Sequence, residues 1–128
     1  MNSGTEDEPN WIVRAGIVTA ESIDSRSSEH LQFPGLYGFS VQYQPGKTIS
    51  ELAQAGQFPN AQISVTTVEQ LVDAAALVGY TVKVVESPGR GFHHTVQLPR
   101  PIPAGLAQAL SDAFLSMPNS VRYPRRGH

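Results

Sequence analysis

Two adjacent histidines, His93 and His94, lie in a stretch that also contains Lys83 and Arg90. Successive side chains on a β-strand point to opposite faces, so neighbouring histidines on one strand cannot share a face. A histidine takes up or releases a proton near neutral pH, and lysine and arginine side chains hold anions. This combination is suited to acid–base chemistry on a phosphodiester, and we predict His93 as its general acid or base.

These residues belong to a predicted β-hairpin. Residues 80–86 and 92–98 are rich in β-branched and aromatic residues, and a proline and two glycines mark the turn between them. A loop over residues 87–91 would place Glu86 opposite Phe92. This register predicts that His94 packs at the edge of the core and that His93 lies on the polar face of the sheet.

The predicted site combines this polar face with residues from two other strands. His93, Lys83 and Thr95 are the candidate catalytic residues, and Arg90 in the turn is a candidate substrate-binding residue. An alternative is that the polar residues only form the solvated face of an antiparallel sheet, which needs no function.

Arg14 and Ser40 are the other two candidate substrate-binding residues. Arg14 interrupts an otherwise apolar strand predicted over residues 11–18, and Ser40 lies on an alternating strand over residues 36–43. An arginine in a covered strand is costly unless it is paired or reaches a cleft. Arg14 is therefore expected either to form a structural salt bridge or to bind an anion at a site.

The composition limits the class of protein. The chain has 128 residues, which corresponds to about one domain, and its formal net charge is −2. It has no cysteine, which excludes disulfides and thiolate chemistry, and no apolar run long enough for a membrane span. We expect a cytoplasmic protein with a disordered N-terminal segment over residues 1–10 and a basic, flexible tail over residues 119–128.

Helices are predicted at three places between the strands. Thr48 and Glu51 form a capping box for a short helix that ends at Gly56, and Thr66 and Glu69 form another for a helix over residues 66–78. The last helix is predicted over residues 104–117, and one further helical turn is possible within residues 21–28. The sequence predicts a single α+β domain over residues 11–118, with a twisted, mainly antiparallel sheet of about five strands and two to three helices on one face.

The first functional hypothesis is an enzyme that acts on RNA or on a nucleotide. The helix at 66–78, followed by a twisted antiparallel sheet carrying His, Lys, Arg and Thr, resembles the general layout of small metal-free ribonucleases and ribonuclease toxins over residues 66–98. That resemblance implies cleavage of a phosphodiester with no metal ion and no cofactor. RNA or a nucleotide would then be the partner.

Two alternatives remain open, and they leave undecided whether the protein is an enzyme. Arg14 followed by Ser64-Val-Thr66 resembles the Arg…Ser-Thr-Ser layout of ADP-ribosyltransferases, in which Glu86 would have to be the late catalytic glutamate, although no Glu-x-Glu is present. The second alternative is a binding or immunity-type module with a protein partner. Its contact residues would be aromatic: Tyr37, Tyr43, Phe58 and Tyr123.

Overall fold

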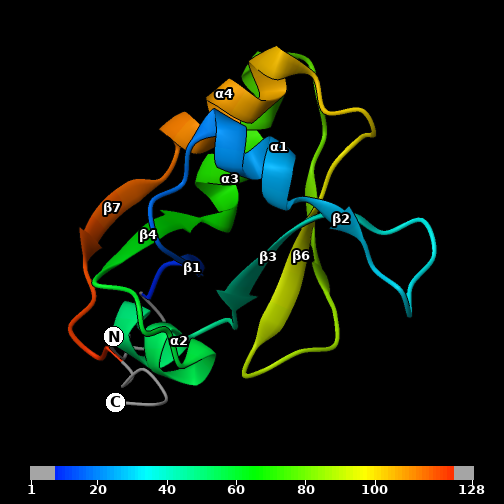
Figure 1. Cartoon of the computed structure of the whole chain (residues 1–128). Coiled ribbons are helices and arrows are strands. Elements are labelled where there is room, and N and C mark those ends of the chain that lie inside the picture. The colour runs from blue at the N-terminus through cyan, green and yellow to red at the C-terminus, as the bar shows by residue number, and fades with distance from the viewer. Residues whose placement is uncertain (1–7, 123–128) are drawn as a thin grey trace, which may run out of the picture.

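A computed structural model of the protein describes residues 8–122 as a single α+β domain built on one antiparallel sheet (Figure 1). Within this range it has four helices and seven strands, so the predicted class is confirmed and the predicted numbers of helices and strands were too low. The elements are β1 (Trp11–Ala15), α1 (Ala20–Arg26), β2 (Ser28–Glu29), β3 (Tyr37–Tyr43), α2 (Ile49–Gly56), β4 (Gln62–Thr67), α3 (Val68–Leu77), β5 (Lys83–Glu86), β6 (His93–Gln97), α4 (Ala104–Asp112) and β7 (Leu115–Pro118).

The strands follow the order β5-β6-β3-β1-β4-β7, and the short strand β2 pairs with the edge of β3. β1 is paired with β4 along its whole length, from Trp11 opposite Thr67 to Ala15 opposite Ile63. Its pairing with β3 is limited to Ile12 with Tyr43 and Val13 with Gln42. β2 pairs with the other end of β3, at Tyr37 and Gly38. Within residues 8–122 the edge of β3 between these two pairings therefore has no neighbouring strand, and the sheet is open there.

Helices cover both faces of the sheet. On one face α1, α3 and α4 pack on strand residues such as Ile12, Phe39 and Val96 and bury the main core. On the opposite face α2 buries Leu52 against Val13 and the apolar residues of β4, which forms a second, smaller core. The prediction that the helices pack on one face is therefore wrong for α2. Its N-terminus agrees with the sequence, because Thr48 and Glu51 form the predicted reciprocal cap.

The start of α3 differs from the prediction by one residue. Thr67, and not Thr66, is the N-cap of α3, and its hydroxyl accepts a hydrogen bond from the Gln70 N–H at 3.1 Å. Thr66 is buried within β4 and pairs with Ile12 of β1. The strand thus continues to the residue before the helix, which leaves Thr67 as the first residue free to cap it.

The last predicted helix is shorter than expected. α4 ends at Asp112, and residues 115–118 form β7, which pairs with β4 from Gln62 to Val65. The backbone groups along this edge of β4 gain partners by this pairing, which outweighs the helical pattern of the segment. Beyond β7, Asn119 is buried and donates hydrogen bonds to the Phe58 and Asn60 carbonyls.

The predicted end segments are described in part. Residues 1–7 and 123–128, which include most of both segments and Tyr123, lie outside the described residues. At the start of the predicted tail, Arg122 donates a hydrogen bond from Nε to the Pro59 carbonyl at 2.6 Å. No helix within residues 8–122 is long and apolar enough to cross a membrane.

Gly38 provides a test of this sheet arrangement. A Cβ at Gly38 would lie 1.7 Å from the Val96 carbonyl oxygen of β6, so the two strands would have to separate. We expect Gly38→Ala to lower the free energy of unfolding by about 1–3 kcal/mol, the range for overpacking. Urea denaturation followed by circular dichroism measures this change.

Gly105→Ala is the matched control, because a Cβ there meets no atom within 4 Å. Gly105 lies within α4, where alanine is favoured over glycine, so this variant should be more stable by about 0.5–1 kcal/mol. Equal stability of the two variants would contradict the close approach of β3 and β6.

Candidate functional site

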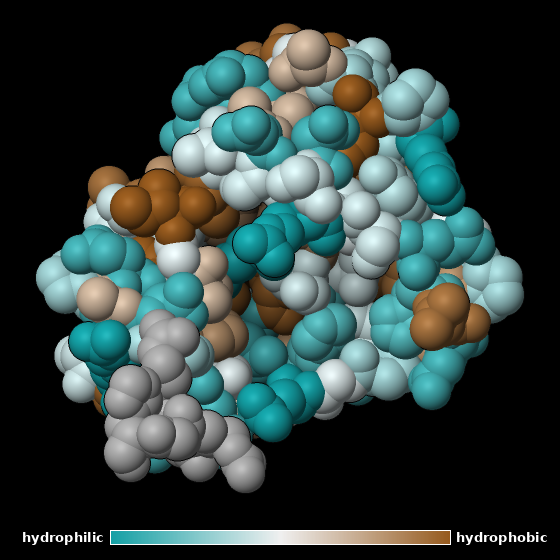
Figure 2. Space-filling view, viewed as in Figure 1, coloured by the Kyte–Doolittle hydropathy of each residue, from teal (hydrophilic) through white to brown (hydrophobic). Residues whose placement is uncertain are grey.

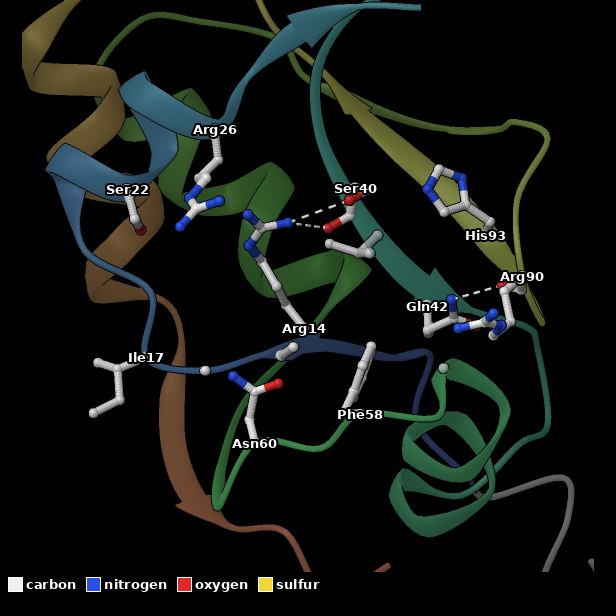
Figure 3. A pocket seen from close by; sticks show the side chains of 14 residues that line it. Arg14, Ile17, Ser22, Arg26, Ser40, Gln42, Phe58, Asn60, Arg90 and His93 are labelled. Carbon is white, nitrogen blue, oxygen red and sulfur yellow. Dashed lines mark hydrogen bonds between the residues drawn. The ribbon is translucent and has the colours of Figure 1, made fainter. Parts of the chain in front are cut away.

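A cavity of about 480 Å³ occupies the opening between β1 and β3. Figure 2 shows this face of the molecule hollowed near its middle, with strongly hydrophilic side chains around the hollow. α1 borders the cavity on one side, and the segment that joins α2 to β4 borders it on the other (Figure 3). Its lining residues are Arg14, Ala15, Gly16, Ile17, Ser22, Arg26, Ser40, Val41, Gln42, Gly56, Phe58, Asn60, Arg90 and His93.

Arg14 bridges the opening in the sheet. Its guanidinium donates hydrogen bonds to the Ser40 carbonyl and, at 3.4 Å, to the Ser40 hydroxyl. The same guanidinium lies over the Phe39 ring at 5.4 Å from its centroid. Burial, and then the nearby charge of Arg26, lower the pKa of Arg14. Arg14 thus binds a backbone carbonyl that the sheet leaves without a strand partner, and the structural salt bridge considered from the sequence is not formed within residues 8–122.

Arg26 and Arg90 add two further guanidinium groups to the same cavity. Arg26 is the last residue of α1, and Figure 3 shows its guanidinium beside that of Arg14. Within residues 8–122 no aspartate or glutamate lines the cavity, and the one ion pair in this range joins Arg100 to Glu29 at 3.3 Å. Three positive charges therefore meet around a space in which the described part of the chain places no negative charge.

A buried amide fixes the turn that carries Arg90. The Gln42 side chain donates a hydrogen bond to the Arg90 carbonyl at 2.8 Å and accepts one from the Phe92 N–H at 2.7 Å. Gly91, between these two residues, has a φ of +69°, which favours glycine. A Cβ there would also lie 2.6 Å from the Ala55 carbonyl oxygen of α2. The turn is thereby held close to both β3 and α2.

His93 is the histidine that lines the first cavity, and its orientation is set by two hydroxyls. Its Nδ1 is 2.8 Å from the Ser87 Oγ, which is in turn 2.9 Å from the Thr95 Oγ1. Ser87 and Thr95 are both buried. Partial burial lowers the pKa of His93, the hydrogen bond with the Ser87 backbone opposes that effect, and the neighbouring His30 and His94 lower the pKa further. With Nδ1 on Ser87, Nε2 is the nitrogen left to meet a ligand.

A second cavity of about 250 Å³ adjoins the first. Arg26, Ser40 and His93 line both cavities. The second cavity is further lined by Ser28, His30, Gly38, Pro88 and Thr95. No carboxylate from the described part of the chain lines either cavity, so the two together form one polar, positively charged hollow.

The structure brings together five of the six residues predicted from the sequence. Arg14, Ser40, Arg90 and His93 line the first cavity, and Thr95 lines the second with His93 and Ser40. Lys83 is exposed and lines neither cavity. The cause is the hairpin register, in which Glu86 pairs with His94 and not with Phe92 as predicted.

A shift of two residues leaves the faces of the strands unchanged but moves Lys83 along the hairpin. Lys83 pairs with Gln97, about 13 Å along the strand from His93 at roughly 3.3 Å per residue. Adjacent to His93, His94 packs at the core edge as expected. Its ring lies edge-on to Tyr43 at 5.1 Å, and its Nδ1 is 2.9 Å from the Phe92 carbonyl oxygen.

The three residues of the ADP-ribosyltransferase pattern do not converge. Ser64 lies opposite Arg14 but is buried, and its hydroxyl donates to the Gly16 carbonyl at 2.8 Å and accepts from the Val18 N–H at 3.0 Å. Glu86 is exposed on β5, at the far end of the strand order from β4, and lines neither cavity. Ser64 thus completes the backbone hydrogen bonds where β1 ends.

Arg26 and His30 are the site residues that the sequence did not identify. Both lie in the polar segment between β1 and β3, for which we predicted no more than one helical turn. α1 has seven residues and buries only Ile23, so its apolar pattern is too short to reveal a helix. The hydroxyl of Thr19 caps α1 by accepting from the Ser22 N–H, and this N-cap residue is the one signal that could have placed Arg26 at a helix end.

No protein-family model, curated protein or solved structure matches this chain. The chemistry of the site therefore has to be inferred from its own residues.

The lowered pKa of His93 has a consequence for stability. Its imidazole should titrate below the value of about 6.5 that is typical of an exposed histidine. The unfolded chain then takes up this proton at a higher pH than the native protein. This group should leave the free energy of unfolding unchanged above pH ~6.5 and reduce it as the pH falls through the native pKa. Two-dimensional NMR of the imidazole nitrogens measures the titration directly.

His93→Gln is the control for that measurement. The loss of stability between pH 7.5 and pH 5, measured by urea denaturation, should be smaller in this variant than in the wild type. A His93 signal that titrates at or above the exposed value would contradict the half-buried position of the ring.

Proposed function

We propose that the cavity between β1 and β3 binds the phosphate group of RNA or of a nucleotide, and that the protein is a metal-independent enzyme that cleaves a phosphodiester with His93. The observation that carries this proposal is the convergence of Arg14, Arg26 and Arg90 on a cavity to which residues 8–122 contribute no carboxylate. Arginine binds phosphate oxygens through paired, charge-assisted hydrogen bonds.

The cost of this arrangement supports a role in anion binding. Two guanidinium groups that lie side by side repel each other, and burial of Arg14 adds a desolvation cost. A bound phosphate would offset both, because it supplies the negative charge that the lining lacks. The volume of about 480 Å³ also falls within the range of roughly 300–1,000 Å³ that is usual for small-molecule sites.

His93 supplies the proton transfer in this proposal. Its lowered pKa keeps the imidazole neutral at neutral pH, as a general base requires. If Nδ1–H donates to the Ser87 hydroxyl and that hydroxyl donates to Thr95, Nε2 carries the free lone pair. The guanidinium groups would stabilise the charge that develops on the phosphate oxygens, which is the task that metal ions have in other phosphoryl-transfer enzymes.

The phosphate-binding part of the proposal is tested with Arg26→Gln. Arg26 is exposed at its helix end, so its replacement should leave the fold intact while removing one phosphate-binding side chain. A charged hydrogen bond contributes about 1.5–3 kcal/mol, which corresponds to a loss of affinity of about 10- to 100-fold. Isothermal titration calorimetry with inorganic phosphate and with a 3′-nucleotide measures this loss.

Arg100→Gln is the matched control, because it removes the same charge from a surface ion pair outside both cavities. Its phosphate affinity should equal that of the wild type at constant ionic strength. Equal losses in the two variants would show that only the overall charge of the protein matters and would contradict a site at the cavity.

The catalytic part of the proposal is tested with the two adjacent histidines. We expect His93→Gln to lower the rate of RNA cleavage by about 10²- to 10⁴-fold, the usual contribution of a general acid or base. His94→Gln should retain activity, because His94 lies on the opposite face beside Tyr43. Single-turnover cleavage of a labelled RNA oligonucleotide, in buffer containing EDTA, measures both rates. Intact RNA with the wild-type protein would contradict the proposed activity.

A further inference from the structure

The cavity between β1 and β3 has a side without charged residues, formed by the segment that joins α2 to β4. Phe58 and Asn60 of this segment both line the cavity. Figure 3 shows them on one side of it, with Arg26 and His93 on the other. A phosphate held by the guanidinium groups would therefore leave the side of Phe58 and Asn60 for an uncharged part of the ligand.

The chain that follows β7 fixes this segment in place. The buried Asn119 side chain donates hydrogen bonds to the Phe58 carbonyl at 3.2 Å and to the Asn60 carbonyl at 3.0 Å. The Asn119 N–H donates to the Ala61 carbonyl at 2.9 Å. The Arg122 Nε donates to the carbonyl of the intervening residue 59 at 2.6 Å. Four consecutive carbonyls are thus held in a segment that forms neither helix nor strand, so its two cavity-lining side chains start from fixed positions.

These two side chains present an aromatic ring and an amide to the cavity. A Cβ at Gly56 would lie 2.4 Å from the Phe58 Cζ, so the tip of the ring rests against the end of α2 and cannot move further toward it. The Asn60 backbone carbonyl is bonded to Asn119, whereas the Asn60 side-chain amide forms no hydrogen bond with any group of residues 8–122. That amide has both a donor and an acceptor to offer a ligand.

We infer that Phe58 and Asn60 bind the nucleobase of the nucleotide whose phosphate lies among the arginines. The inference rests on the proposed phosphate site and adds to it the two residues that determine base recognition. A nucleobase is flat and stacks on aromatic rings, and its edge carries a hydrogen-bond donor beside an acceptor, which an amide can pair with. Adenine is the best probe, because its 6-amino group lies beside an acceptor nitrogen on both of its edges.

The wild-type protein tests this inference with three ligands that share the sugar phosphate. They are adenosine 3′-phosphate, purine riboside 3′-phosphate, which lacks the 6-amino group, and 1,4-anhydroribitol 3-phosphate, which lacks the base. By isothermal titration calorimetry, adenosine 3′-phosphate should bind about 5- to 100-fold more tightly than the ligand without a base, as expected for stacking on an aromatic ring. It should bind about 2- to 10-fold more tightly than the purine riboside, as expected for one neutral hydrogen bond.

Variants of the two residues should remove these differences separately. Asn60→Ala should bind adenosine 3′-phosphate and purine riboside 3′-phosphate equally. Phe58→Leu, which keeps an apolar side chain, should lose most of the preference for ligands with a base. Phe33→Leu is the matched control and should behave as the wild type, because Phe33 lines neither cavity. All three variants should retain the wild-type affinity for 1,4-anhydroribitol 3-phosphate, which shows that the phosphate site is still folded.

The same titrations separate this inference from the proposal on which it rests. Equal affinity of the wild-type protein for the ligands with and without a base would overturn the nucleobase site and leave the phosphate site standing. Equal losses in Phe58→Leu and Phe33→Leu would also overturn it, because the base would then bind elsewhere. If none of the three ligands binds to the wild-type protein, the phosphate site and the nucleobase site both fail.

Discussion

β1 pairs with its two neighbouring strands over different lengths, and this difference determines where the sheet opens and where the cavity lies. β1 is paired along its length with β4 but meets β3 at only two positions, and β2 takes the far end of β3. On this edge of β3, a stretch is left to which the described residues add no strand, and Arg14 supplies the hydrogen bond that a strand would have given to Ser40. An arginine in a central strand is otherwise costly, so the open edge and the partly buried guanidinium explain each other. The cavity exists because a side chain, and not a backbone, spans this gap.

The fold class, and five of the six residues of the candidate site that the cavities bring together, could be predicted from the sequence because both depend on local patterns. The alternation of side chains along a strand correctly placed His93 and Thr95 on one face of the sheet. The predicted register was wrong by two residues, but the face is unchanged because side-chain direction repeats every two residues. Lys83 was misplaced by the same error, since reach along a strand depends on the absolute register. β7 was missed because its segment has a helical pattern, and pairing with β4 overrides that pattern. Arg26 was missed because a helix of only seven residues depends on tertiary contacts more than on its own sequence.

The electrostatic character of the site differs from that of the whole protein. The chain carries a formal net charge of −2, yet three guanidinium groups surround the main cavity with no carboxylate in its lining. Among residues 8–122 the acidic side chains lie outside this lining, as with Glu29 in its surface pair with Arg100 and Glu51 at the cap of α2. The amino-acid composition does not reveal this separation of positive from negative side chains, because the separation depends on how the chain folds. Overall net charge is therefore a poor guide to the ligands of a small domain with a recessed site.

The side-chain amide of Gln42 forms hydrogen bonds with the backbone of Arg90 and Phe92, on both sides of Gly91. These bonds restrict which insertions and deletions the loop can accept. Most hairpin loops tolerate insertions and deletions, since their ends are the only fixed points. Here the middle of the loop is fixed as well, so adding or removing one residue would detach Arg90 or His93 from its place even if every side chain were retained. We expect related chains to conserve the spacing from residue 87 to residue 93 more strictly than the identities of the residues within it.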